Sequence, residues 1–257
     1  MESVQSDAGR AVITRVTEGH WRAVADDREI GRGDASHRPD GRIFLSIDAW
    51  HGAVFDRLAE AMLSELPRPL HTLVDGTDED TTARWERAGL AVRRREWLYQ
   101  VPTGARPDPV PAPAGITLLP VGAAEEGLLQ EAYSAIRAEI EATVGWATMP
   151  VEVPARPVGA PIDPARYAVA AGPDRYEGLV RVVARRRHAR IGLIAVRADR
   201  RRRGIGRALL VDVLAALHRD GIDTASADVD EFNAAAMALF EAVGGRRVGS
   251  GLELSIR

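Results

Sequence analysis

The sequence predicts an α+β (α/β) fold, in which β-strands alternate with helices. Two observations lead to this fold class. Short apolar, strand-like runs are interleaved with amphipathic segments of helical period, and one proline-rich stretch separates two such series. The chain of 257 residues, of which 46% are hydrophobic, is long enough to bury a core on each side of that stretch.

The proline-rich stretch covers residues 101–115 and contains five prolines. Proline continues neither a helix nor a central strand, and a run of this kind favours an extended spacer. We therefore predict a first domain over residues 1–104, a linker over 105–115 and a second domain over 116–257.

In the first half, apolar alternation predicts strands at 10–16, 20–25, 42–50 and 70–74 and an amphipathic helix at 53–66. A second helix at 81–88 ends at Gly89. In the second half, strands are expected at 116–120, 167–171, 177–185, 191–196, 224–229, 246–249 and 252–256, and helices at 123–142, 207–219 and 234–243. A proline-rich connection spans residues 148–164, and Gly221 is a favourable left-handed residue at a helix end.

The two halves resemble each other faintly. Aligned without gaps, residues 70–75 match 225–230 and residues 83–89 match 238–244, with Val, Asp, Ala, Glu and Gly coinciding. Alanine-rich helices that end in glycine also match by chance, so coincidence is the alternative. We predict a tandem duplication.

Composition excludes several classes of function. No cysteine occurs, which removes disulfides, thiolate metal sites and cysteine nucleophiles. All 34 basic residues are arginine, but the formal net charge is −3, so the chain lacks the basic character that nucleic acid binding requires. No stretch approaches roughly 18 uninterrupted apolar residues, and the polar N-terminus does not resemble a signal peptide. We expect a cytoplasmic protein without a nucleic acid or membrane partner.

One segment combines a strand, a turn and a helix start in the order that a diphosphate site requires. The apolar strand 191–196 is followed by R-x-x-G-x-G, formed by Arg201, Gly204 and Gly206. Glycines let the backbone direct N–H groups into one concavity, and the next helix adds its unpaired N–H groups and positive dipole end. The turn is not a Walker loop, because no lysine follows, nor a dinucleotide fingerprint, because only two glycines occur.

The pattern V-x-x-x-x-R-x-x-G-x-G-x-x-L-L, from Val196 to Leu210, resembles the acetyl-CoA motif of the GNAT superfamily. Downstream, Asn233, Ala236 and the run Leu-Phe-Glu-Ala-Val-Gly at 239–244 resemble that family's N-x-x-A-x-x-L-Y-E-x-x-G-F segment. The resemblance covers residues 116–257. Together with the repeat between the two halves, it implies two GNAT-like domains, each a mixed, mostly antiparallel sheet flanked by helices, with a catalytic second domain and a degenerate first domain that lacks the cofactor loop.

The resemblance also implies a set of site residues. The backbone of strand residues Leu193, Ile194, Ala195 and Val196 would pair with the pantetheine arm of acetyl-CoA, at a splay between this strand and strand 224–229. An N–H near Val196 would polarise the thioester carbonyl. The pyrophosphate would lie on the loop formed by Arg201, Arg202, Arg203, Gly204, Ile205, Gly206 and Arg207, with Asn233 and Phe240 bordering the pantetheine and thiol. Acetyl-CoA acts as co-substrate, and no metal is needed.

The sequence departs from the family at two positions that bear on proton transfer. The family often has a tyrosine where Phe240 stands and a glutamate near Arg190. The candidates for a catalytic base are therefore Asp228, His188, Glu139 and Glu141, although a strand-end carboxylate or a histidine in a basic turn is more often simply solvated. In the first half, Trp50, His51 and Trp85 line either a ligand pocket or, as is commoner for aromatic residues beside a helix, a core.

These features favour an N-acetyltransferase that acts on a primary amine of a small molecule, such as an antibiotic-like amine. Acetylation of a protein N-terminus or lysine is a second hypothesis, and a non-catalytic acyl-CoA-binding module is a third. Nothing in the sequence indicates the oligomeric state.

Overall fold

The computed structural model describes residues 11–38, 40–104, 110–146, 149 and 160–257. The chain forms two units. The N-terminal unit comprises Met1–Arg95 together with Ser250–Arg257, and the C-terminal unit comprises Glu96–Gly249. The linker residues 105–109, and most of the proline-rich connection predicted at 148–164, lie outside the described residues.

The N-terminal unit contains a sheet with the strand order β1-β2-β3-β4-β5-β12. Its elements are β1 (Val12–Thr17), β2 (His20–Ala25), β3 (Arg28–His37), β4 (Ile43–Ala49), α2 (Gly52–Glu65), β5 (Leu70–Asp75), α3 (Glu79–Arg87) and the end of β12 (Arg246–Ile256). Strands β4 and β5 are parallel, whereas the other neighbours are antiparallel.

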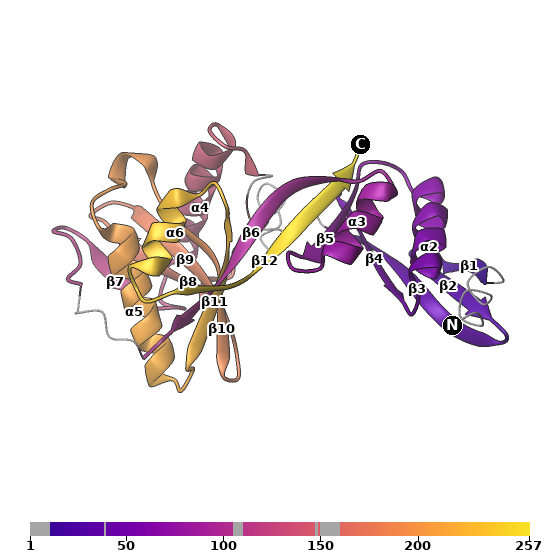
Figure 1. The fold of residues 1–257 in the computed structure, drawn as a ribbon. Helices are drawn as coiled ribbons and strands as arrows, with labels where there is room; N and C mark the ends of the chain where they lie inside the picture. The colour runs from indigo at the N-terminus through magenta and orange to yellow at the C-terminus, as the bar shows by residue number, and fades with distance from the viewer. Residues whose placement is uncertain (1–10, 39, 105–109, 147–148, 150–159) are drawn as a thin grey trace. The chain divides into compact units, whose positions relative to one another are not determined.

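Two glycines allow helix α2 to pack closely on strand β3. A Cβ atom at Gly31 would lie 2.9 Å from Val54 Cγ1, and one at Gly33 would lie 2.5 Å from Met62 Sδ. Because these glycines carry no side chain, the buried face of α2 reaches the sheet directly. Trp85 of α3 joins the same core and meets the ring of Phe55 edge-on at 5.1 Å. The helices α2 and α3 thus share one core with the sheet (Figure 1).

The C-terminal unit has the strand order β6-β11-β10-β9-β8-β7. Its elements are the end of β6 (Ala91–Pro102), β7 (Thr117–Leu119), α4 (Glu126–Glu141), the short 3₁₀ turn η2 (Pro164–Arg166), β8 (Tyr167–Ala171), β9 (Tyr176–Arg185), β10 (His188–Val196), the 3₁₀ turn η3 (Ala198–Arg200), α5 (Ile205–Arg219), β11 (Thr224–Asp230), α6 (Ala234–Glu241) and the start of β12. Among the described strands of this unit, β10 and β11 are the only parallel neighbours.

Helices cover both faces of this second sheet (Figure 1). Leu209, Val213 and Phe240 from α5 and α6 share one core with Ala225 and Ala227 of β11. A second core lies on the other face, where α4 packs against β8, β9 and β10; its members include Leu129, Tyr133, Ile136, Val169, Leu179 and Leu193. Strand β10 thus contributes to both cores, Ile191 to the first and Leu193 to the second, whereas the apolar residues of β11 belong to the first core alone.

The last strand of each half of the chain completes the sheet of the other unit. Residues 96–102 of β6, which follow α3, pair with β11, and residues 251–256 of β12, which follow α6, pair with β5. The two pairings are equivalent. Asp75 pairs with Gly251, and Asp230 pairs with Glu96. Position 230 lies 155 residues after position 75, and position 251 lies 155 residues after position 96. The faint sequence repeat has this same offset, so the pairing supports a duplication.

The structure confirms the predicted fold class, since both sheets are mixed, mostly antiparallel and flanked by helices. Two strands were not predicted. Strand β3 lacks the alternation of apolar and polar residues that predicts a strand, because Gly31 and Gly33 stand at its buried positions. In β6 a run of arginines interrupts the same alternation. The division between the units also differs from the predicted linker: it falls at Arg95, inside β6, because the following seven residues, 96–102, already belong to the second sheet.

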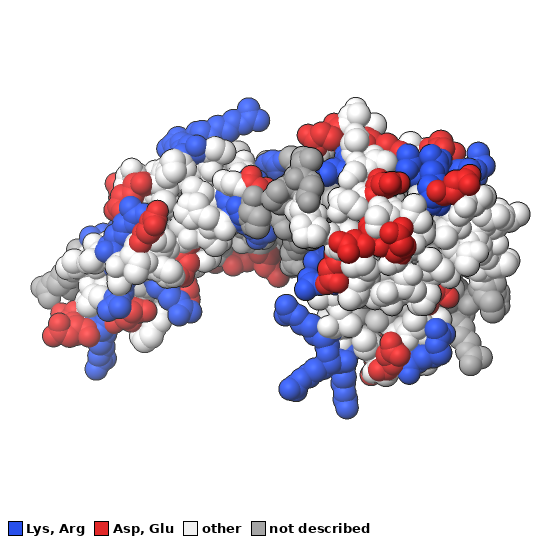
Figure 2. All heavy atoms as spheres, turned by 180° about the vertical axis from the view of Figure 1, so that it is seen from behind, with Lys and Arg blue, Asp and Glu red and all other residues white. Residues whose placement is uncertain are grey.

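The surface shows no dominance of one charge among the residues drawn in Figure 2, where acidic and basic side chains are interspersed on the visible face of each unit. Within the described part of the chain, no helix has the length and apolar character that crossing a membrane requires.

Candidate functional site

Strand β10 separates from its neighbour β11 in the middle of the second sheet. The two strands pair only over His188–Arg190 and Thr224–Ser226, although both continue further. On its other side β10 stays paired with β9 as far as Val196, with a bulge at Gly192. A strand paired on one side only directs alternate N–H and C=O groups toward the open side. The splay that the family resemblance implies is therefore present, at the residues predicted to meet pantetheine.

The turn after β10 has the geometry of an anion cradle. Gly204 is the N-cap of α5, adopts a left-handed conformation with φ of 82°, and has no side-chain cap. The first N–H groups of α5 consequently have no side-chain acceptor from the cap residue, and they lie at the positive end of the helix dipole. Gly206 faces Val196 Cγ2, which a Cβ atom would approach to 3.6 Å, so the helix start packs against the end of β10.

The arginines of the turn fall into two groups. Arg200 lies 3.3 Å from the buried Glu177, and Arg201 donates to the carbonyl of Val196 at 3.1 Å and lies 3.7 Å from Glu139. These two side chains hold the turn itself. By contrast, Arg202, Arg203 and Arg207 are exposed and have no ion-pair or hydrogen-bond partner within the described residues, so they are the three guanidinium groups that remain for a phosphate.

Glu139 fixes the position of the turn from outside. Its Oε2 atom accepts a hydrogen bond from the backbone N–H of Ala198 at 2.7 Å, at the start of η3. The carboxylate also lies 4.0 Å from Arg197. The other glutamate considered as a base, Glu141, accepts a hydrogen bond from the N–H of Trp146 at 2.8 Å. Both carboxylates thus have structural contacts within the unit.

The two predicted catalytic residues lie on one polar face of β10 and β11. His188 Nε2 is 2.8 Å from Ser226 Oγ, and its Nδ1 is 3.3 Å from Thr224 Oγ1. Asp228 forms an ion pair with Arg190, the residue that stands near the family's glutamate. The structure therefore brings His188 and Asp228 onto the same face, but it gives Asp228 a cationic partner. Their catalytic roles remain predictions.

The remaining predicted site residues lie on α6. Asn233 is the N-cap of this helix and accepts a hydrogen bond from the N–H of Ala236 at 3.0 Å. Phe240 is buried and stacks on Tyr99, with 5.8 Å between ring centroids. Tyr99 Oη donates to Glu241 at 2.8 Å and accepts from Arg247 at 2.8 Å.

Sequence reasoning missed the Tyr99 hydroxyl group. Burial raises the pKa of this phenol, and the neighbouring Glu241 raises it further against the opposing effect of Arg247. The residue comes from β6, at a large distance in the sequence from Phe240, and no local motif points to it. Only the pairing of β6 with β11 places it there.

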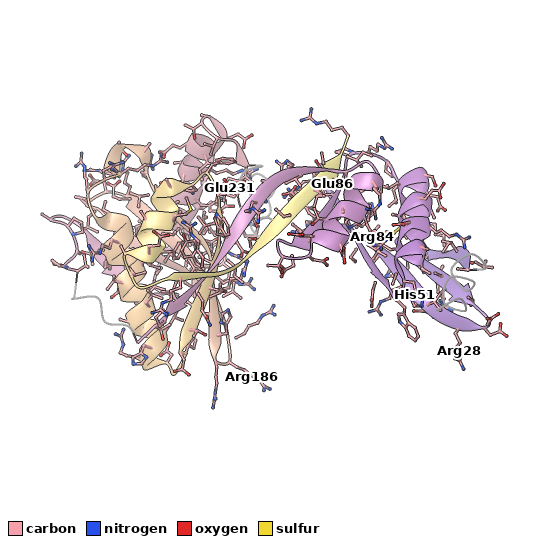
Figure 3. All side chains as sticks on the ribbon, viewed as in Figure 1. Arg28, His51, Arg84, Glu86, Arg186 and Glu231 are labelled. Atoms are coloured by element: carbon pink, nitrogen blue, oxygen red, sulfur yellow. The ribbon has the colours of Figure 1, made fainter. Side chains whose placement is uncertain are left out.

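In the N-terminal unit an arginine occupies the position equivalent to the anion cradle. Helix α2 follows β4 as α5 follows β10, but its N-cap is His51 and its first residue is Gly52. The guanidinium of Arg84, from α3, lies directly against Gly52 and pairs with Asp56 at 3.1 Å (Figure 3). That the first half lacks a cofactor loop stays a prediction. Trp85 is a core residue, whereas Trp50 is 74% exposed.

The arrangement in the C-terminal unit fits an acyl-CoA ligand. A left-handed glycine, a helix N-terminus and three exposed arginines suit a diphosphate, and the adjacent splay suits an extended amide-bearing arm. No group of three or more His, Asp or Glu side chains with metal-binding geometry occurs among the described residues.

Comparison with known proteins gives the same family as the motifs. Residues 136–244 match the model of the acetyltransferase (GNAT) family. No curated protein sequence matches the chain at a significant level.

Solved structures of similar fold cover nearly the whole chain. A GCN5-related N-acetyltransferase from Sphaerobacter thermophilus is 17% identical with a TM-score of 0.69, over 99% of this chain and 84% of its own. A tandem GNAT protein from the clavulanic acid biosynthesis pathway is 16% identical with a TM-score of 0.63, over 96% and 83%. A GCN5-related N-acetyltransferase from Kribbella flavida is 15% identical with a TM-score of 0.61, over 99% and 93%. At these identities the likeness shows the fold.

The family match lies within the residues predicted from the two motifs, and it contains β10, the cradle and α6. The predicted family and the predicted enzyme class are both confirmed. Residues 136–244 are a GNAT-family acetyltransferase domain.

Proposed function

We propose that the chain is an N-acetyltransferase that uses acetyl-CoA as co-substrate and acetylates a primary amine of a small molecule. The observation that carries the proposal is the continuity of the splay with the cradle: β10 leaves β11 after Arg190 and ends at the turn that caps α5 with Gly204. An extended arm and its diphosphate need these two features in this order.

The phosphate end of the site depends on charge and backbone donors. Arg202, Arg203 and Arg207 supply charge-assisted hydrogen bonds, and the N–H groups at the start of α5 supply the rest. Arg200 and Arg201 keep the turn in shape through Glu177, Glu139 and the carbonyl of Val196. This division explains why the glycines of the motif are more informative than its arginines.

The reacting end depends on the open side of β10. Acetyl-CoA supplies an activated thioester when it is bound. The acceptor nitrogen forms a C–N bond with the acetyl carbon as the C–S bond breaks, the amine loses a proton and the thiolate gains one. A backbone N–H on the open side of β10 stabilises the negative charge that develops on the carbonyl oxygen. Positioning of the amine beside the thioester provides much of the rate.

Of the two predicted catalytic side chains, His188 is better placed to accept the proton. Among the polar groups of the described residues, its imidazole contacts the hydroxyl groups of Ser226 and Thr224, whereas Asp228 forms an ion pair with Arg190. Imidazole is the commonest general base in enzymes. In this proposal Asp228 fixes Arg190, and the pair forms the floor of the acceptor site.

The proposal is tested by placing a carboxylate in the cradle. Gly204→Asp puts negative charge against the phosphates, and we expect at least a tenfold loss of acetyl-CoA affinity in calorimetric titration. Gly221→Asp is the matched control, because Gly221 also has a left-handed φ, 75°, with open space around it, and lies at the other end of α5. Equal affinities of the two variants would refute the cradle.

Thiol release in the presence of amines tests the chemistry. We expect turnover with some members of a panel of small primary amines and none with a lysine-containing peptide, and we expect His188→Gln to lower kcat roughly 100-fold. Turnover with the peptide alone would favour protein acetylation. Tight acetyl-CoA binding without turnover for any amine would show a non-catalytic acyl-CoA-binding module, which the replacement of the family tyrosine by Phe240 also favours.

A further inference from the structure

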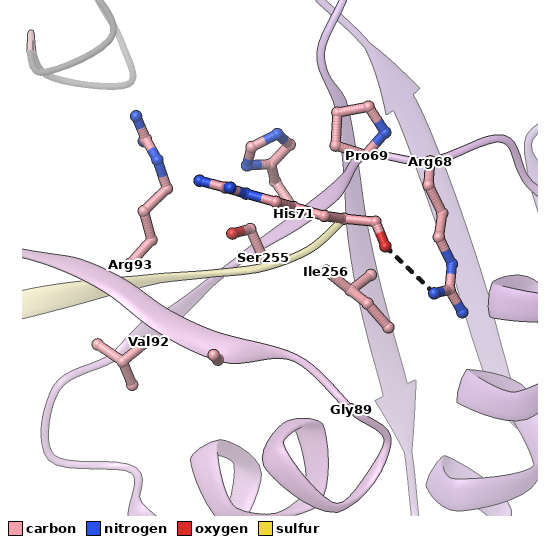
Figure 4. A pocket seen from close by; sticks show the side chains of 10 residues that line it. Arg68, Pro69, His71, Gly89, Val92, Arg93, Ser255 and Ile256 are labelled. Carbon is pink, nitrogen blue, oxygen red and sulfur yellow. Dashed lines mark hydrogen bonds between the residues drawn. The ribbon is translucent and has the colours of Figure 1, made fainter.

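The N-terminal unit contains a pocket that takes no part in the proposed acetyl transfer. Its volume is about 740 Å³, which lies within the range of about 300–1,000 Å³ typical of small-molecule sites. Apolar side chains from three segments form part of the wall: Pro69 before β5, Val92 in β6 and Ile256 in β12. Four basic residues also line the pocket, Arg68, His71, Arg93 and Arg257, and Figure 4 labels the first three.

His71 is a buried side chain with a ring nitrogen left for a ligand. The residue is 6% exposed, and its ring stacks on Phe44 with 5.2 Å between centroids. Nδ1 lies 3.0 Å from Glu253 Oε1, and because a carboxylate accepts, Nδ1 is the donor. Nε2 makes no hydrogen bond with the described residues and is not one of their buried, unpartnered atoms, so this nitrogen of a pocket-lining side chain is accessible to a ligand.

The surroundings of the pocket carry an excess of positive charge. The carboxylate of the buried Glu253 accepts hydrogen bonds from Arg94 Nε at 2.7 Å and from Arg93 Nη1 at 2.8 Å. Two guanidinium groups therefore pair with one carboxylate. Arg42 lies 3.6 Å from the same carboxylate and is itself paired with Asp40 at 2.8 Å. No acidic side chain lines the pocket.

Arg68 adds a further cationic group at the mouth of the pocket. It is exposed, and its Nη1 atom donates to the main-chain oxygen atom of Arg257, the last residue of the given sequence, at 3.2 Å. A guanidinium has five N–H donors in a planar fork, so this single bond leaves donors that suit a carboxylate or phosphate. The walls therefore combine cationic and apolar groups.

We propose that this pocket binds a small organic anion, whose carboxylate or phosphate group lies between Arg68 and His71 Nε2 and whose apolar part packs on Pro69, Val92 and Ile256. A proton on Nε2 then donates to the anion while Nδ1 donates to Glu253.

The test uses the full chain and three probes of similar size: benzoate, phenyl phosphate and the neutral benzyl alcohol. Calorimetric titration at constant ionic strength, without acetyl-CoA, is expected to show binding of benzoate or phenyl phosphate and none of benzyl alcohol. The preferred anion separates a carboxylate ligand from a phosphate ligand. Arg68→Gln is expected to weaken anion binding at least tenfold, whereas Arg28→Gln, which removes an exposed arginine elsewhere in the unit, leaves it unchanged.

Three results would overturn the proposal: no binding of either anion, equal binding of benzyl alcohol, or the same affinity in Arg68→Gln as in the unchanged chain. Gly204→Asp, which is directed at the cradle in the other unit, serves as a second control and is expected to bind the anion normally. Failure of the acetyltransferase proposal and failure of this one are therefore distinguishable.

Discussion

At the scale of single residues, Glu253 links the end of the chain to the N-terminal unit. It is 1% exposed and contacts His71, Arg93 and Arg94, which are all far from it in the sequence. Burial by itself raises the pKa of the carboxyl group, but the hydrogen bond from His71 and the charges of Arg94 and Arg93 outweigh it and lower the pKa from 4.5 to about 2. The native state thus favours the carboxylate form.

Glu253→Gln is expected to lower the free energy of unfolding at pH 7 by roughly 3 kcal/mol, which is the value of the pKa shift. A carboxyl group with a lowered native pKa stabilises the fold above pH 4.5, and this contribution is lost as the pH falls toward 2. The variant therefore has a flatter stability profile between pH 5 and pH 2, which urea unfolding across this range measures. Glu29→Gln, in an exposed ion pair with Arg22, is the control and changes little. Parallel profiles for Glu253→Gln and the unchanged chain would contradict the prediction.

The sequence alone was sufficient to predict the strand, turn and helix that form the cradle, because these residues are contiguous. The order strand, R-x-x-G-x-G and helix is local, and the structure has it at the predicted positions. It was not sufficient for residues that act on the cradle from a distance. Glu139 accepts a hydrogen bond from the N–H of Ala198 in the turn, 59 residues away in the sequence. The guanidinium of Arg84, from another helix, lies against Gly52. Single-sequence reasoning has no signal for such contacts, since a glutamate or arginine on a helix is usually solvated.

At the scale of elements, the strands that the sequence did not predict are those whose side chains are unusual for a sheet. Strand β3 carries glycines on the face that meets α2, and β6 carries three consecutive arginines. In both cases tertiary contacts override local propensity. The bulge at Gly192 in β10 is of the same kind, because one glycine inside a strand pattern does not distinguish a bulge from a close backbone approach.

Gly31→Val tests the contact between β3 and α2. The new side chain would meet Val54, Leu58 and Ala49, whose nearest atoms lie 2.9, 3.1 and 3.2 Å from the position of a Cβ atom. We expect overpacking to cost about 1–3 kcal/mol of unfolding free energy, as measured by urea denaturation. Gly251→Val is the matched control in β12 of the same unit: nothing lies within 4 Å of its Cβ position, and valine suits a strand. Equal stabilities of the two variants would refute the close approach of α2.

At the scale of the whole molecule, the exchange of the final strands determines where along the sequence one unit ends and the other begins. A proline-rich stretch is a sound sign of a boundary between two self-contained domains, and it was the basis of the predicted linker at 105–115. Here each half ends in a strand that belongs to the other unit, so the division falls inside β6 and again inside β12. Sequence patterns report local structure, and they do not report which sheet a strand joins.

Removal of residues 250–257 tests this exchange. The shortened chain loses Leu252 and Leu254, two buried side chains worth roughly 1.5–3 kcal/mol each, together with Glu253 and the whole β12 edge of β5. The combined loss is comparable with the total stability of a domain, about 5–15 kcal/mol. We therefore expect the N-terminal unit to unfold while the C-terminal unit, which keeps all its strands, stays folded. Hydrogen exchange reports the two separately, through amides of α2 and of α5.

A peptide of residues 246–257 added to the shortened chain is expected to restore protection in α2, because it supplies the missing strand. Gly249→Ala in the full chain is the control for a change near the boundary, since nothing surrounds its Cβ position. Protection of α2 in the shortened chain at the level of the full chain would show that the N-terminal unit is stable without β12. The outcome decides whether the two halves fold as independent domains or as partners that depend on an exchanged strand.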